Sequence, residues 1–160
     1  MEKHRELRRR FLADGISASL LLPLLGTGLL HPERVLASEW KTRAFTARST
    51  SDALQQLALT GATESRDIVI NAPEIAENGA KVDIEIASNL SGTRSLLLLA
   101  DRNPMPLCAE INFAGNALPY AKVQIKLAET TRIRALARTS DGRTHVAIRE
   151  VKVTLGGCGG

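Results

Sequence analysis

The residues whose types most clearly suggest chemistry stand at the end of the chain. There Leu155 is followed by Gly156, Gly157, Cys158, Gly159 and Gly160. Cysteine supplies a nucleophilic sulfur, and glycine has no side chain that a folded core could bury. Fixing the backbone of one residue costs about 1–2 kcal/mol, so we expect this segment to be mobile unless a partner binds it. Fully extended, the five residues span roughly 17 Å at ~3.3–3.6 Å each. The pattern predicts a thiol on a slim flexible arm that can enter a narrow channel.

Nothing near Cys158 in the sequence would activate its thiol. The pKa of a cysteine falls beside cations, a helix N-terminus or a metal, whereas Cys158 has four glycines and the carboxylate of Gly160 around it. The reactivity must therefore come from the active site of another protein, which favours a carrier over an enzyme. The opposing interpretation is a frayed end with an incidental cysteine, and the symmetric glycine pairs argue against it.

The beginning of the chain has the pattern of an export signal. Arg8, Arg9 and Arg10 are followed by Phe11 and Leu12, which is the core of a twin-arginine signal. A moderately apolar stretch of about 15 residues follows, shorter than the ~20 needed to span a bilayer. The small residues of the segment 35–37 suit a cleavage site, which places the mature start near residue 38. We therefore expect a periplasmic protein that is not membrane-bound after cleavage of residues 1–37.

The net charge of +4 arises partly in this leader. Residues 1–37 hold six of the 21 Lys/Arg and four of the 17 Asp/Glu, which leaves a net charge of +2 for the remainder. The aromatic residues after position 37 are too sparse for stacking on bases: Trp40, Phe45, Phe113 and Tyr120. Nucleic acid is therefore an unsuitable partner.

The sequence offers no pattern for a metal site or a catalytic constellation after the leader. His145 is the one histidine there, and a lone histidine in a strand is usually a half-exposed sheet residue. No Gly-rich phosphate loop lies between a strand and a helix. A pair formed by Cys108 and His145 has no local support. We therefore predict no metal and no cofactor for this chain.

The elements that must position the arm are mostly strands. One helix is expected over residues 53–59, capped by Asp52 and ended by Gly61. Apolar residues then recur at every second position, or in a short run, in seven segments: 68–70, 82–86, 96–99, 111–113, 123–127, 133–137 and 146–155. In the last segment the parity changes after Ile148, so we predict a bulge near Arg149 and Glu150.

Roughly seven short strands with turn signals between them predict an all-β protein, an immunoglobulin-like antiparallel β-sandwich with a short N-terminal helix and a flexible C-terminal arm. The predicted organisation is a signal peptide over 1–37, a helical segment over 38–66, the sandwich over 67–155 and the arm over 156–160. The arm then leaves directly from the last strand.

Three segments resemble a known family. Residues 150–160, residues 70–80 (INAPEIAENGA) and residues 103–107 (NPMPL) look like the sulfur-carrying Y subunit of the periplasmic thiosulfate-oxidising (Sox) system. The resemblance covers nearly all of the chain after residue 37, and the twin-arginine leader is typical of that subunit. Cys108 is outside the family pattern, and it is interpreted either as a buried apolar cysteine or as an off-cycle disulfide partner of Cys158.

The resemblance implies a non-enzymatic carrier whose Cys158 bears thiosulfonate, persulfide and sulfonate intermediates. It implies a heterodimer with a SoxZ-like β-sandwich subunit that has no leader of its own. It also implies partner enzymes that load and unload the cysteine: a haem c enzyme (SoxAX-like), a dinuclear manganese hydrolase (SoxB-like) and, in some organisms, a molybdenum and haem sulfur dehydrogenase (SoxCD-like).

Two rival functions remain open at this point. In a thiocarboxylate carrier the terminal Gly160 itself would be activated, but such carriers need a β-grasp fold and adenylation by ATP, and the export signal and strand pattern argue against both. In the other rival, a periplasmic β-sandwich subunit uses Cys158 only for a disulfide to another chain.

Overall fold

Two short helices precede nine strands in residues 37–155, the part of the chain that the computed structural model describes. The helices are α3 (Ala37–Thr46) and α4 (Thr50–Gln56). The strands are β1 (Thr63–Glu64), β2 (Ile68–Asn71), β3 (Ile75–Ala76), β4 (Val82–Ser88), β5 (Thr93–Ala100), β6 (Leu107–Asn112), β7 (Tyr120–Ile125), β8 (Thr131–Thr139) and β9 (Thr144–Val153).

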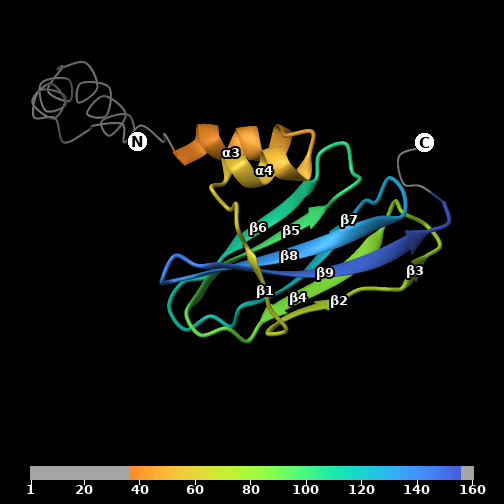
Figure 1. The fold of residues 1–160 in the computed structure, drawn as a ribbon. Helices are drawn as coiled ribbons and strands as arrows, with labels where there is room; N and C mark the ends of the chain where they lie inside the picture. The colour runs from red at the N-terminus through yellow and green to blue at the C-terminus, as the bar shows by residue number, and fades with distance from the viewer. Residues whose placement is uncertain (1–36, 156–160) are drawn as a thin grey trace, which may run out of the picture. The chain divides into compact units, whose positions relative to one another are not determined.

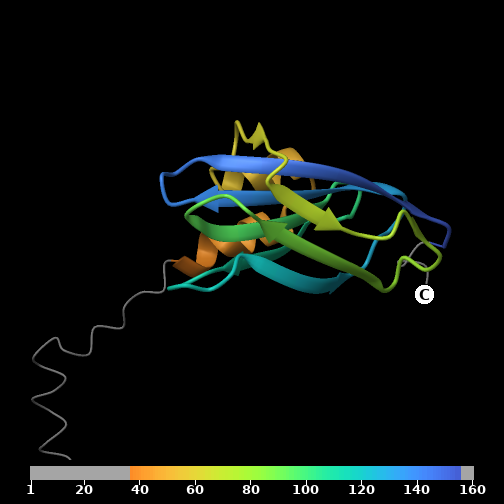
Figure 2. The same ribbon diagram turned by 90° about the horizontal axis from the view of Figure 1, so that it is seen from below.

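The strands form two sheets. The larger has six strands in the order β1-β9-β8-β5-β6, with β3 also paired to β9, and the smaller has the order β2-β4-β7. The long neighbours are antiparallel, whereas the two-residue strands β1 and β3 run parallel to β9. Figure 1 shows the two sheets as layers, and Figure 2 shows them from below. The predicted all-β sandwich is confirmed.

The space between the sheets is filled by every second side chain along each strand. Leu96 and Leu98 of β5 and Ile133 of β8 meet Ile84 and Ile86 of β4, and all five are fully buried. Because side chains alternate between the faces of a strand, this parity leaves the neighbouring residues on the opposite face of the large sheet.

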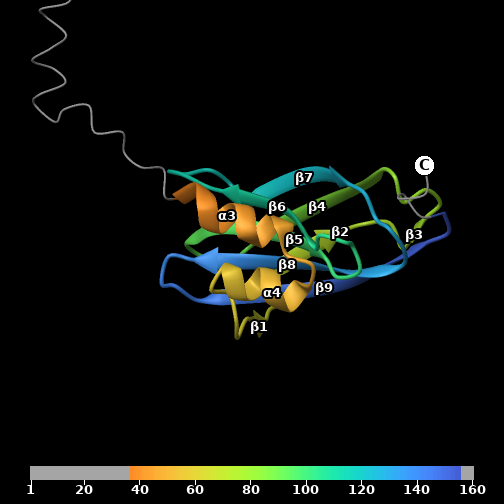
Figure 3. The same ribbon diagram turned by 90° about the horizontal axis from the view of Figure 1, so that it is seen from above.

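That opposite face is also buried, because the two helices cover it (Figures 1 and 3). Leu97 and Leu99 of β5 lie there with Leu136 of β8. They pack against a helical layer that includes the buried residues Ala44, Ala47, Ala53, Leu57 and Leu59. The run of four leucines in β5 therefore serves two separate clusters, one on each side of the sheet.

The bulge predicted near Arg149 and Glu150 is wrong. The pairing of β8 with β9 continues without a shift from Arg138 opposite Thr144 to Thr131 opposite Val151. The parity change has another cause: Val146 faces the helical layer, whereas Val151 faces the space between the sheets. A regular strand whose two faces are buried at different points needs no bulge.

The predicted ends of the helix are also wrong. Helix α4 begins after Ser49, whose hydroxyl accepts a hydrogen bond from the Asp52 N–H at 3.1 Å. The helix ends where Ala58, with φ of 52°, takes the left-handed conformation, and the Leu59 N–H donates to the Leu54 carbonyl at 2.8 Å. This is a Schellman ending with alanine in the place usually held by glycine. The burial of Leu57 and Leu59 against the sheet favours this early turn.

Replacement of Leu97 by alanine tests whether the helical layer is part of the core. Leu97 is 1% exposed in that layer, so Leu97→Ala should lower the free energy of unfolding by about 2–5 kcal/mol in urea denaturation. The control Val69→Ala changes a side chain that is 47% exposed on β2 and should stay within about 0.5 kcal/mol of the unchanged protein. Equal effects of the two substitutions would contradict burial beneath the helices.

Candidate functional site

The predicted attachment residue Cys158 and its neighbours Gly156, Gly157, Gly159 and Gly160 lie outside the described residues. The described part ends at Leu155, just after β9. The part of the site that the structure describes is the segment directly before the predicted arm. We call residues 152–155 the arm base.

One side of the arm base is held by the segment around β3. Ile75 lies opposite Lys152 and Ala76 lies opposite Val153 in a parallel pairing. The Lys152 N–H donates to the Glu74 carbonyl at 3.0 Å, and the Thr154 N–H donates to the Ala76 carbonyl at 3.1 Å. The Thr154 hydroxyl adds a bond of 2.9 Å to the carbonyl of Glu77. The chain is thus fastened up to the last turn before the arm.

Gly79 connects the end of the arm base to the core. Its N–H donates to the Leu155 carbonyl at 2.7 Å, and its carbonyl accepts from the Leu127 N–H at 2.7 Å. Leu127 is fully buried between the sheets. The last described residue is therefore two hydrogen bonds away from a core residue.

The other side of the arm base is held by Thr130, just before β8. Its hydroxyl accepts a hydrogen bond from the Val153 N–H at 2.9 Å and lies 3.5 Å from the Val153 carbonyl oxygen. The regular pairing of β8 with β9 stops at Thr131 and Val151, so a side chain replaces the backbone partner at this point. The strand is consequently held on both edges when it reaches the arm.

Asn103 joins two loops at this same end of the sandwich. Its amide Nδ2 donates to the Lys126 carbonyl at 2.8 Å, and its Oδ1 accepts from the Ala128 N–H at 3.0 Å. Leu127, the residue that binds Gly79, lies between these two partners. The segments 70–80 and 103–107, which are far apart in the sequence, thus converge on the structure that carries the arm.

Cys108 of β6 is a half-buried thiol that packs against the core between the sheets. Its Sγ lies 3.4 Å from the Pro106 carbonyl oxygen and 3.9 Å from Asn103 Nδ2. Burial raises the pKa of this thiol to about 11, despite opposing hydrogen bonds from the Ala100 backbone and Asn103. The interpretation as a buried apolar cysteine is met only in part, because the thiol is half-buried and has polar neighbours; a disulfide with Cys158 involves a residue outside the described part.

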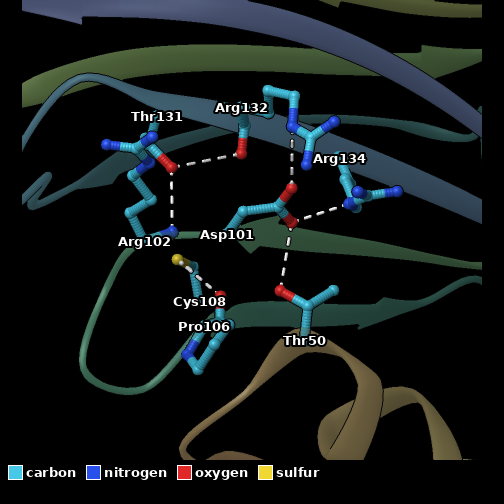
Figure 4. A network of polar contacts seen from close by, with 8 residues as sticks. All are labelled: Thr50, Asp101, Arg102, Pro106, Cys108, Thr131, Arg132 and Arg134. Atoms are coloured by element: carbon cyan, nitrogen blue, oxygen red, sulfur yellow. Dashed lines mark hydrogen bonds and ion pairs between the residues drawn. The ribbon is translucent and has the colours of Figure 1, made fainter.

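A polar network beside Cys108 attaches the helical layer to the large sheet (Figure 4). Asp101, which follows β5, accepts from Arg134 Nε at 2.6 Å and from the Thr50 hydroxyl at 3.0 Å through Oδ1. Arg132 Nε lies 3.3 Å from its Oδ2. Each partner comes from β8 or α4, so this carboxylate positions the first turn of α4 and serves as a structural group.

Residues 37–155 contain no group of His, Cys, Asp and Glu that could hold a metal ion. His145 is a half-buried residue of β9 opposite Ala137, as expected for a lone histidine in a strand. A hollow of about 400 Å³ beside the arm base is lined by Glu77, Lys81 and Asp83 among others. No helix within the described range is long and apolar enough to span a membrane.

The fold and the arm base define a class: a two-layer β-sandwich, covered by helices on one face, whose last strand continues into a cysteine-bearing extension. Residues 54–158 match the family described as "Sulfur oxidation protein SoxY". This match covers well over half of the chain and includes Cys158. The chain belongs to the SoxY family.

A solved structure supports this assignment. The sulfur carrier protein SoxY from Chlorobium limicola f thiosulfatophilum is 30% identical, and the aligned region covers 66% of this chain and 96% of that one with a TM-score of 0.59. A superoxide reductase (neelaredoxin) from Ignicoccus hospitalis is 18% identical over 66% of this chain and 90% of its own, with a TM-score of 0.49. A likeness that remote supports no inference about activity. No curated protein shows a significant match.

Thr130→Val tests the fastening of the arm base. The substitution keeps the shape of the side chain but removes the acceptor of the Val153 N–H. Loss of one hydrogen bond weakens the local structure by about 1 kcal/mol, which corresponds to about fivefold faster amide exchange at Val153. NMR can measure the amide exchange rate of Val153 in both proteins, with the amide of Val146 as an internal control. Unchanged exchange at Val153 would mean that Thr130 does not hold the strand.

Cys108 should make the protein less stable at alkaline pH. Its pKa is raised from 9.0 to about 11 in the folded state, so between these values the unfolded chain loses the proton while the folded chain keeps it. Unfolding is then favoured as the pH rises through this window. Urea denaturation at several pH values between 8 and 11 should show a smaller alkaline loss of stability for Cys108→Ala than for the unchanged protein. Parallel pH profiles of the two proteins would contradict the raised pKa.

Proposed function

We propose that this chain is a covalent sulfur carrier in thiosulfate oxidation and that Cys158 is its attachment site. The observation that carries the proposal is that the family match extends through residue 158, beyond the last strand, into the glycine-flanked cysteine. The arrangement of the described residues supports it, because hydrogen bonds from two separate segments, residues 74–79 and Thr130, hold the base of this extension.

The first step forms a sulfur–sulfur bond. The Cys158 thiol gives up its proton, and the thiolate and thiosulfate together give up two electrons to the haem c enzyme, so that a cysteine S-thiosulfonate results. The electrons leave through that enzyme, because this chain is proposed to hold no redox group. The role of the chain is to present the sulfur at the end of an arm without side chains.

The next steps release the product and recycle the carrier. Water attacks the terminal sulfone at the manganese hydrolase, sulfate and two protons leave, and a persulfide remains on Cys158. Where the sulfur dehydrogenase is present, three water oxygens are added to the outer sulfur while six electrons and six protons leave. A final hydrolysis of the sulfonate frees sulfate and restores the thiol.

The catalytic groups of these steps belong to the partners. Residues 37–155 contain no group of His, Cys, Asp and Glu that could hold a metal ion, and Cys108 is a half-buried thiol with a raised pKa. We therefore propose that the chain is not an enzyme and needs no cofactor. Glycine suits such an arm, because residues without side chains pass through an entrance that other residues would block.

The proposal includes the compartment and the principal partner. The twin arginines of the segment 8–12 support export to the periplasm by the twin-arginine pathway, with residues 1–37 as the signal peptide. Membership of the SoxY family supports assembly with a SoxZ-like subunit. The enzymes proposed to act on the sulfur bound to Cys158 are SoxAX-like, SoxB-like and SoxCD-like.

Intact-mass analysis of Cys158→Ser tests the assignment of the attachment residue. The unchanged protein, isolated from cells supplied with thiosulfate, should carry added sulfur species, and Cys158→Ser should carry none. Cys108→Ser is the matched control, because it removes the other cysteine and should still be loaded. Sulfur on the Cys158→Ser protein, or none on the unchanged protein, would overturn the proposal.

A further inference from the structure

We propose that two exposed apolar residues, Ile75 beside the arm base and Leu155 at its end, form the docking surface for the active-site entrance of the enzymes that process Cys158. This inference rests on the proposed function, because it concerns the partners of the same cysteine. It assigns a contact role to two residues of the sandwich itself, outside the arm.

The length of the arm makes contact with this surface unavoidable. Cys158 lies three residues after Leu155, and three fully extended residues span at most roughly 11 Å. An enzyme that encloses the sulfur must therefore bring the walls of its entrance within this distance of Leu155. The residues around Leu155 then lie against those walls.

The arm cannot easily gain length by detaching its base. The Leu155 carbonyl is bound by the Gly79 N–H at 2.7 Å, and Thr154 is bound through both its N–H and its hydroxyl to residues 76 and 77. Each net hydrogen bond contributes about 0.5–1.5 kcal/mol, so releasing the base would lose several of them together. The reach of Cys158 is accordingly set from Leu155.

The arm base and the strand paired with it expose two large apolar side chains among charged ones. Leu155 is 69% exposed and Ile75 is 56% exposed, although both are large aliphatic side chains. Three exposed charged residues are close to them in the chain or in the strand pairing: Glu74, Glu77 and Lys152. An apolar centre with a polar rim is the usual anatomy of a protein interface.

The occupant that fits is an apolar rim around a channel mouth, and the contact should be small. A carrier that visits several enzymes must leave each of them, and transient complexes lie at the low end of interface sizes, below about 1,200 Å². Two aliphatic side chains beside a short arm match such a contact. All of these enzymes would then contact Ile75 and Leu155, because each enzyme must approach the same arm base.

The test measures loading of the full-length protein by the thiosulfate-oxidising haem c enzyme of the same organism, with thiosulfate as the probe. Ile75→Glu and Leu155→Glu should each lower kcat/KM for formation of the Cys158 adduct by at least tenfold, because a charge is placed against an apolar rim. Ile75→Val should stay within twofold of the unchanged protein. The matched control is Val69→Glu, which places the same charge at an exposed apolar position on the smaller sheet.

Alkylation of Cys158 by iodoacetamide separates docking from damage to the arm. Its rate should be the same within twofold in all these variants, because a small reagent needs no docking surface. Loading of Ile75→Glu and Leu155→Glu at the unchanged rate, or an equal loss in Val69→Glu, would overturn this inference and leave the carrier function standing. Failure of the unchanged protein to be loaded at all would overturn both.

Discussion

The structure depends on the burial of β5 and β8 on both of their faces. In β5, Leu96 and Leu98 lie between the two sheets while Leu97 and Leu99 lie beneath the helices, and all four are at most 1% exposed. At about 25 cal/mol per Å² of apolar surface, such burial is the main source of stability for a domain of this size. It makes the large sheet a rigid central layer. The arm base gains its fixed position because β9 is paired with β8 in that layer.

Much of this fold could be predicted from the sequence, because alternation of apolar residues reports which strand faces are buried. The prediction failed where both faces are covered. The change of parity after Ile148 was interpreted as a bulge, yet it reflects a strand that passes from the helical layer to the sandwich interior. The helix ends failed for a related reason: Ser49 rather than Asp52 caps α4, since the tertiary contacts of Leu57 and Leu59 decide where the helix stops.

The candidate site shows a similar division. Cys158 and its glycines could be singled out from residue type alone, and the family match extends to Cys158 itself. The structure that holds the arm could not be foreseen, because most of its bonds join backbone atoms of Glu74, Ala76, Gly79 and Leu127, which any residue would supply. The one local signal was the resemblance of segments 70–80 and 103–107 to the family. The structure explains their resemblance by bringing both to the end of the sandwich where the arm begins.

The pairing of the last residues of β9 also has a mechanical consequence. Strand β3 runs parallel to β9 and Thr130 holds the opposite edge, so the bonds around residues 152–155 lie side by side along the chain. A tension applied along the extension would be shared among these bonds and would not break them one after another. If Cys158 is the attachment site proposed above, a force applied to it would be transmitted through these bonds to the large sheet.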